Sequence, residues 1–109
     1  MDNNAALESQ FHLRLLRLAE ENSKVGVRGD FITSMVANRG AVEAARIMVN
    51  DKVNPPPPAV ATLLLLGRPE LTVEYVIANG PEWALLYPDD FSSLQERSRG
   101  KLVEWGFRI

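Results

Sequence analysis

Apolar residues recur every three or four positions over most of the chain, which is the spacing of one face of an α-helix. The first such stripe consists of Leu7, Phe11, Leu15 and Leu18. It predicts a helix over about residues 4–22. Leu13 and Leu16 lie outside the stripe. Because extra apolar surface is normally buried, we expect them to be covered by another helix or by a second copy of the chain.

The next segment predicts two short helices that meet at Arg39-Gly40. Asp30 is expected to cap the first of them, and the second should run over about residues 41–49. Two short helices joined in this way also resemble a helix-turn-helix. The second helix would offer only Glu43 and Arg46 to a DNA groove, so we favour a packing corner.

Four consecutive prolines, Pro55 to Pro58, form the only low-complexity segment. Each proline fixes φ and lacks a donor, so we expect a stiff polyproline II link between two helical parts, residues 1–54 and 59–109. A ligand for an aromatic-lined groove is the less favoured alternative. Residues 59–66 are apolar on every side and predict a buried, central helix.

Helix start and stop signals are densest over residues 66–83. Gly67 ends one helix, and Thr72 is expected to cap the next through its hydroxyl. Gly80 suits the left-handed position after that helix, and Pro81 prevents its continuation. The segment therefore predicts a short helix between two turns.

The last helix is expected to begin at Pro88, which fits the first helical position, with Asp89 and Asp90 in its first turn. Its apolar stripe consists of Phe91, Leu94, Ser98, Leu102 and Trp105. Gly106 should end it. No long segment alternates with period two, so the chain predicts an all-α fold. We expect one compact domain over residues 1–109, a bundle of about five to six helices.

Composition adds limits on compartment and chemistry. The 109 residues include 46% hydrophobic and 24% charged residues, as in an ordinary globular domain. No cysteine is present, which excludes disulfides and thiolate metal sites. No apolar run approaches the ~20 residues that span a bilayer, and the polar N-terminus does not resemble a signal peptide. We therefore expect a cytoplasmic protein without a membrane segment.

Charge is unevenly distributed along a chain of net charge −2. Residues 68–96 contain six acids and one base, whereas residues 97–109 contain four bases and one acid. The net charge argues against a protein whose main task is to bind phosphate backbones. Separate acidic and basic patches suit a protein partner, although such patterning usually marks a solvated face.

Four short segments together resemble a family of small bacterial helical domains. They are Phe11-His12, Gly40-Ala41-Val42-Glu43-Ala44-Ala45-Arg46, Gly67-Arg68-Pro69-Glu70-Leu71-Thr72-Val73-Glu74 and Pro81-Glu82-Trp83. The family pattern is roughly Phe-His, Gly-Gly-x-x-Ala-Ala, Arg-x-Asp-Leu-Thr-Val-Glu and Pro-Glu-Trp. Here Ala41 replaces the second glycine, Glu70 replaces the aspartate, and Tyr87 stands where a capping threonine is usual. The resemblance implies a helical fold over nearly the whole chain, and it implies no activity.

Catalytic chemistry has little support in the sequence. His12 is the only histidine, so histidine pairs are excluded, and a structural role is favoured over general-base work. Asp89 and Asp90 could be metal ligands, but their place near a helix start explains them. No phosphate-binding glycine loop and no nucleophile turn is present. We expect a non-enzymatic protein without cofactor or metal.

Two binding functions remain open. The favoured one is a protein-interaction or adaptor module that binds an unidentified protein partner or a second copy of itself. Its candidate surface consists of Leu13, Leu16, Arg68, Glu70, Glu82 and Asp89. The alternative is an accessory nucleic-acid binder, whose affinity would fall steeply with salt. Its candidate contacts are Arg14, Arg17, Arg39, Arg97, Arg99 and Lys101. The sequence also leaves open whether Trp83 and Trp105 line a pocket or fill the core.

Overall fold

A computed structural model describes residues 3–51 and 56–108. Its elements in chain order are α1 (Asn3–Lys24), α2 (Asp30–Arg39), α3 (Ala41–Asn50), α4 (Pro58–Leu66), η1 (Pro69–Leu71), α5 (Val73–Ala78), η2 (Pro81–Leu86) and α6 (Phe91–Trp105). The η elements are short 3₁₀-helices. The described residues include no strand, so the predicted all-α fold is confirmed. None of their helices has the length and apolar character needed to cross a membrane.

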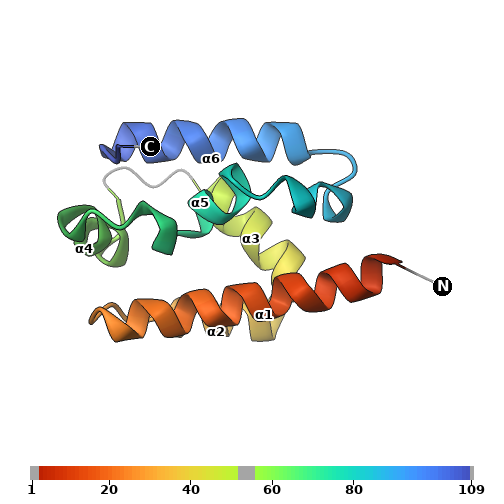
Figure 1. Cartoon of the computed structure of the whole chain (residues 1–109), viewed down its shortest axis with the longest axis horizontal. Coiled ribbons are helices and arrows are strands. Elements are labelled where there is room, and N and C mark those ends of the chain that lie inside the picture. The colour runs from red at the N-terminus through yellow and green to blue at the C-terminus, as the bar shows by residue number, and fades with distance from the viewer. Residues whose placement is uncertain (1–2, 52–55, 109) are drawn as a thin grey trace.

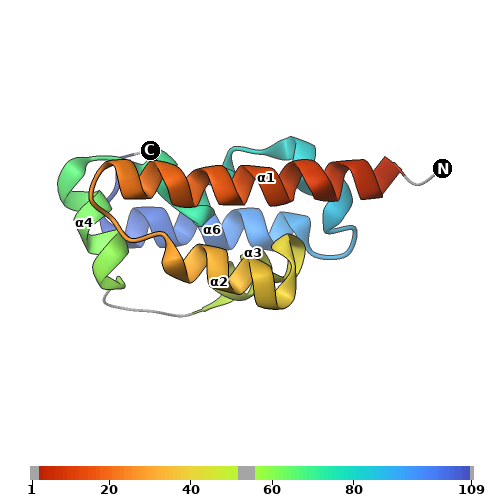
Figure 2. The same cartoon turned by 90° about the horizontal axis from the view of Figure 1, so that it is seen from below.

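The two longest helices, α1 and α6, lie along the long axis on opposite sides of the molecule (Figure 1). Between them lie α3 and α5, and α5 packs mainly against α6. Figure 2 shows α2 beside α1, and it places α4 at the end of the molecule opposite the N-terminus. The molecule measures 44 × 26 × 20 Å.

The core is built from the two predicted stripes. On α1, Phe11, Leu15 and Leu18 are fully buried. On α6, the buried residues are Leu94, Ser98, Leu102 and Trp105. Between them, Ile77 of α5 is also fully buried. Burying a side chain of this size contributes roughly 1.5–3 kcal/mol, so this shared core holds the two long helices together.

Several contacts join the residues before the prolines to those after them. The ring of Phe11 lies 4.9 Å from the ring of Trp83. The side chain of Asn22 donates to the carbonyl of Leu71 at 3.0 Å. The hydroxyl of Tyr87 donates to the carbonyl of Val42 at 2.7 Å. Trp83 therefore fills the core, and the two helical parts form one body.

The prediction that residues 59–66 form a buried central helix is wrong. The helix exists, but only Leu63 of α4 is buried, and Leu65 is 88% exposed. The helix lies at one end of the molecule, where neighbours cover only one of its sides (Figure 2). Of the proline link, Pro55 lies outside the described residues. Pro57 is extended, with φ −57° and ψ 155°, and Pro58 is already the first residue of α4.

Thr72 caps α5 as predicted, because its Oγ1 accepts a hydrogen bond from the backbone N–H of Tyr75 at 3.1 Å. The expected cap at Asp30 is wrong: Gly29 is the N-cap, and the Asp30 carboxylate accepts from Arg28 instead. Asp90 is likewise not in the first turn of α6, which begins at Phe91. In both places the carboxylate accepts a hydrogen bond from an arginine that lies close to it in the fold.

Gly80 does not adopt the predicted left-handed conformation, because its φ is −119°. Glycine is required there for a different reason. A Cβ atom would lie 2.4 Å from the ring of Trp83 and 2.5 Å from the carbonyl oxygen of Val76. The absent side chain thus makes room for the tryptophan that packs on α1.

Candidate functional site

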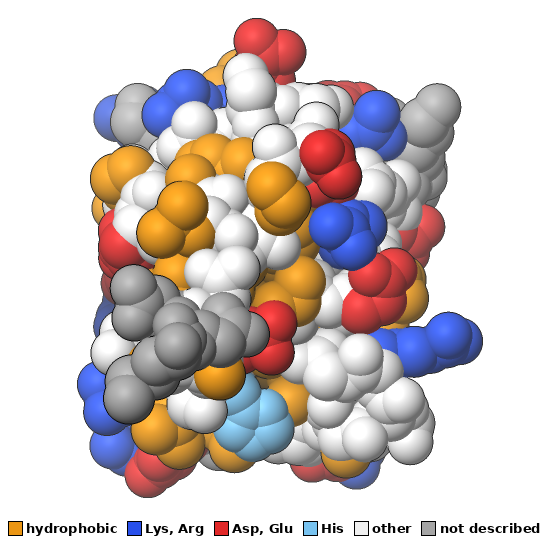
Figure 3. All heavy atoms as spheres, turned by 90° about the vertical axis from the view of Figure 1, so that its right-hand side faces the viewer, with side chains coloured by type: hydrophobic (Ala, Val, Ile, Leu, Met, Phe, Trp, Pro, Cys, Tyr) orange, Lys and Arg blue, Asp and Glu red, His pale blue; other side chains and the backbone are white. Residues whose placement is uncertain are grey.

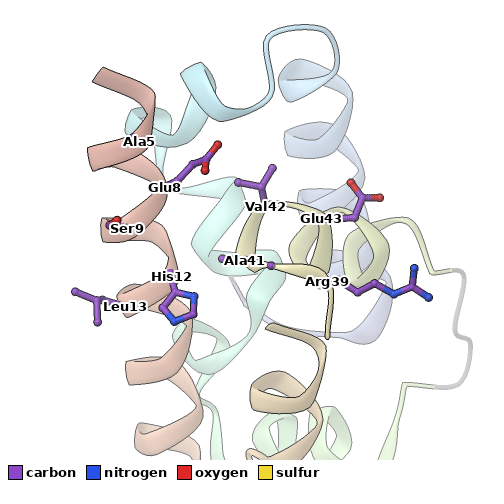
Figure 4. A pocket seen from close by; sticks show the side chains of 10 residues that line it. Ala5, Glu8, Ser9, His12, Leu13, Arg39, Ala41, Val42 and Glu43 are labelled. Atoms are coloured by element: carbon purple, nitrogen blue, oxygen red, sulfur yellow. The ribbon is translucent and has the colours of Figure 1, made fainter. Parts of the chain in front are cut away.

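A groove of about 810 Å³ separates the N-terminal half of α1 from the α2–α3 corner (Figure 4). Its lining residues are Ala5, Glu8, Ser9, His12, Leu13, Arg39, Gly40, Ala41, Val42 and Glu43. We call it the α1–α3 groove. In Figure 4, Glu8 points from α1 toward Val42, whereas Leu13 points away from α3 at the outer edge.

The corner that forms one wall depends on Gly40. This residue has φ 80°, and nothing lies within 4 Å of the position that a Cβ would take. The positive φ, and not a lack of space, is what calls for glycine. The turn lets the chain reverse between α2 and α3, so that Ala41 is buried in the core cluster. The predicted packing corner at Arg39-Gly40 therefore forms the groove.

His12 follows the buried Phe11 and is exposed. Figure 3, which faces this end of the molecule, shows the histidine at the surface with apolar side chains beside it. His12 has no hydrogen-bond partner among the described residues, so nothing there orients its ring for general-base work. Those residues also contain no group of three or more acids or histidines arranged to hold a metal.

Beside the groove, α3 carries a set of interacting charges. Arg46 donates to Asp90 Oδ2 at 2.9 Å and to Glu43 at 2.6 Å. Its guanidinium also lies 5.2 Å from the centre of the Tyr87 ring. The hydrogen bond to Asp90 raises the pKa of Arg46 further above its ordinary value, against the opposing effect of burial. Arg46 is thus a structural residue, and it holds Glu43 at the rim of the groove.

The candidate interaction surface is not brought together as one patch. Leu13 is 60% exposed and lines the groove, whereas Leu16 is half-buried and packs against the core. Arg68 and Glu70 form an ion pair with each other. Burial acts to raise the pKa of Glu70, but the hydrogen bond and charge of Arg68, together with a backbone hydrogen bond, lower it below its ordinary value. Of the six candidates, only Leu13 lines the α1–α3 groove.

The second candidate set, the basic residues, is divided by the structure. Arg99 donates to the carbonyl of Ala78, and Lys101 is half-buried and bonded to three acceptors. Arg14 is half-buried, and its Nη1 has no partner among the described residues. Arg17, Arg39 and Arg97 are exposed and have no hydrogen-bond partner among the described residues.

Sequence reasoning missed a second cavity, of about 510 Å³, beside α4. We call it the α4 pocket. Its apolar lining residues are Phe31, Ile32, Met48, Pro57, Pro58, Ala59, Val60, Leu63, Leu71, Val73 and Trp105. Its polar lining residues are Arg28, Asp51, Thr72, Glu74 and Lys101. Trp105 therefore both belongs to the core and lines a pocket. The uniformly apolar sequence of α4 was the one signal for it, because a helix at the surface normally has a polar side.

Lys101 and Glu74 meet inside this pocket. The Lys101 ammonium donates to Glu74 Oε2 at 2.7 Å and to the carbonyls of Met48 and Val49 at 2.9 and 3.3 Å. It also lies 5.0 Å from the centre of the Trp105 ring. One lysine of α6 thereby ties α5 to the last turn of α3. Because both charged side chains are nearly covered, removing either one would leave a buried, unpaired charge.

Comparison of the chain with protein families, curated proteins and solved structures found no match. The resemblance to a family of small bacterial helical domains therefore stays a prediction. The geometry of the groove and the pocket has to carry the functional argument.

Proposed function

We propose that this chain is a non-enzymatic, cytoplasmic protein-interaction module that binds a segment of a partner protein in the α1–α3 groove. The observation that carries the proposal is the exposure of Leu13, a large apolar side chain that is 60% exposed at the edge of an open groove. Covering such a side chain on binding contributes on the order of 1 kcal/mol.

The walls of the groove fit a peptide segment better than a small metabolite. Ala5, Ala41 and Val42 give them an alkyl character, while Glu8 and Arg39 bring charges of both signs. A mixture of apolar and charged groups is usual for a protein-binding surface. A partner segment with one bulky apolar side chain and flanking charges would match it.

Nucleic-acid binding is supported less well. Arg99 and Lys101 already bond to acceptors within the chain. The net charge is −2. The remaining exposed arginines lie on three different helices, so few phosphate contacts can be made from one face.

The test compares Leu13→Glu with the matched control Val103→Glu. Val103 is 64% exposed and lies on α6, outside the groove. Both tagged variants and the parent chain are used to capture proteins from cells that express the chain, with and without nuclease. We expect a partner that survives nuclease to be retained by Val103→Glu and lost with Leu13→Glu.

Three other outcomes would contradict the proposal. Equal capture by both variants would remove the groove from the interface. Partners that disappear with nuclease would favour the nucleic-acid alternative. A parent chain that sediments as a dimer, and a Leu13→Glu variant that sediments as a monomer, would mean that the groove binds a second copy.

A further inference from the structure

The α4 pocket has the size and lining of a ligand site. Its volume of about 510 Å³ lies within the range of roughly 300–1,000 Å³ typical of small-molecule pockets. Leu63, Val73 and Trp105 are buried residues that form part of its wall. Phe31, also among its lining residues, is 64% exposed. An apolar body could therefore be enclosed on several sides.

The polar groups in this pocket are not equally available to a ligand. An ammonium group has three donors, and those of Lys101 are directed to Met48, Val49 and Glu74. Glu74 uses only Oε2 in this pair, and its Oε1 has no partner among the described residues. Among the described residues, the pocket thus keeps a carboxylate oxygen that can accept, and its one lysine has no free donor.

The other charged residues that line the pocket are Arg28 and Asp51. Arg28 forms an ion pair with Asp30. Asp51 is exposed and forms no ion pair with a described residue. Arg28 is exposed at the surface and donates to Asp30 through Nη2 alone, so its other donors face solvent. A neutral apolar ligand would leave Glu74 Oε1 without a donor, which is costly in an apolar site.

We propose that the α4 pocket binds a small organic amine, with its aromatic or branched alkyl body against Leu63 and Trp105 and its ammonium group donating to Glu74 Oε1. The unpartnered Oε1 of Glu74 carries this choice, because a charge-assisted hydrogen bond in a desolvated site is stronger than a neutral one. This site is separate from the α1–α3 groove, and it does not depend on the proposed protein partner.

The test uses 4-phenylbutylamine and its neutral isostere 4-phenylbutan-1-ol. Each is titrated into the full chain and followed by NMR at the indole N–H resonances of Trp105 and Trp83. We expect the amine to shift the Trp105 resonance, to leave Trp83 unchanged, and to bind about tenfold more tightly than the alcohol. Glu74→Gln keeps the shape but removes the charge, so it should abolish most of that preference.

Phe31→Ala is the second variant, because Phe31 is exposed and its loss should not disturb the core. We expect it to weaken binding of the amine and the alcohol to a similar extent. If Glu74→Gln does not fold, the affinities of the amine and the alcohol for the parent chain and for Phe31→Ala still test the proposal. Equal affinities for the two ligands would overturn the proposal. So would shifts that do not involve Trp105, or no shift up to the solubility limit.

Discussion

At the scale of single residues, Tyr87 shows how one buried hydroxyl joins distant parts of the chain. The side chain is 1% exposed, with the ring of Phe11 edge-on and the ring of Phe91 stacked. Its hydroxyl donates to the carbonyl of Val42. Burial raises the pKa of this hydroxyl well above its ordinary value of 10, and the nearby charge of Arg46 offsets only part of that effect. The native state therefore holds the proton that the hydrogen bond needs.

We expect Tyr87→Phe to lower the free energy of unfolding by about 1 kcal/mol at neutral pH, because the hydrogen bond is lost. The unfolded chain releases the tyrosine proton near pH 10, whereas the native state keeps it to higher pH. The stabilisation is complete below pH 10 and declines above it, by at most about 1.4 kcal/mol per pH unit. Urea unfolding at increasing pH should therefore show the parent chain approaching the variant.

The half-buried Tyr75 provides the control for this experiment. Its hydroxyl makes no hydrogen bond to a described residue, so Tyr75→Phe removes a tyrosine hydroxyl without removing such a bond and should cost less stability at neutral pH than Tyr87→Phe. Parallel curves for the parent chain and Tyr87→Phe would mean that the buried hydroxyl does not titrate differently in the native state.

At the scale of elements, two glycines of similar surroundings have opposite roles. Nothing lies within 4 Å of the position a Cβ would take at Gly67 or at Gly100. Gly67 ends α4 with φ 66°, a left-handed conformation. Gly100 lies within α6, where backbone freedom in the unfolded chain only weakens the helix. Because neither glycine lacks room for a side chain, substitutions at Gly67 and Gly100 test the effect of backbone conformation alone.

We expect Gly100→Ala to raise the free energy of unfolding by roughly 0.5–1 kcal/mol, because alanine is the better residue inside a helix. Gly67→Ala should lower it by about 1 kcal/mol, because a side chain is strained in the left-handed conformation. Thermal unfolding followed by circular dichroism would measure both changes. Changes of the same sign would show that packing, and not the backbone, governs these positions.

Helices were predictable from the sequence where the residues that define them lie within or next to the helix itself. The stripe ending at Leu18 and the glycine at Gly106 lie within the helices that they define, and both predictions are confirmed. The burial of α4 depends on what lies around it, which no local pattern contains. Asp90 lies just before α6 and bonds to Arg46, 44 residues away, a partner that no local pattern indicates.

The candidate sites were less predictable for the same reason. Leu13 was identified by its position outside the apolar stripe, and it does line a groove. The α4 pocket was not anticipated, because Glu74 and Lys101 are 27 residues apart and each has an ordinary local explanation. Glu74 lies in the first turn of α5, where an acid suits the helix dipole, and Lys101 belongs to the basic segment at the end of the chain. Only the fold makes them a pair.

At the scale of the whole molecule, the parts before and after the prolines depend on each other. Phe11 packs on Trp83, and Lys101 binds the last carbonyls of α3. These contacts join different pairs of elements, α1 with η2 and α3 with α6. A molecule whose two parts are joined at several places should unfold as one unit, although its sequence suggests two helical parts.

We therefore expect one cooperative transition, tested with Trp83→Phe and Trp105→Phe, each of which keeps a single fluorescent reporter. Trp105 then reports on the α4 end, and Trp83 reports on the contact with α1. In each variant, the urea midpoint from fluorescence should coincide with the midpoint from circular dichroism, as two-state unfolding requires. Each substitution will shift the common midpoint, so the comparison is made within a variant. A fluorescence midpoint that precedes the loss of helix would mean that one end opens first, and the contacts of that end would then not hold the two parts together.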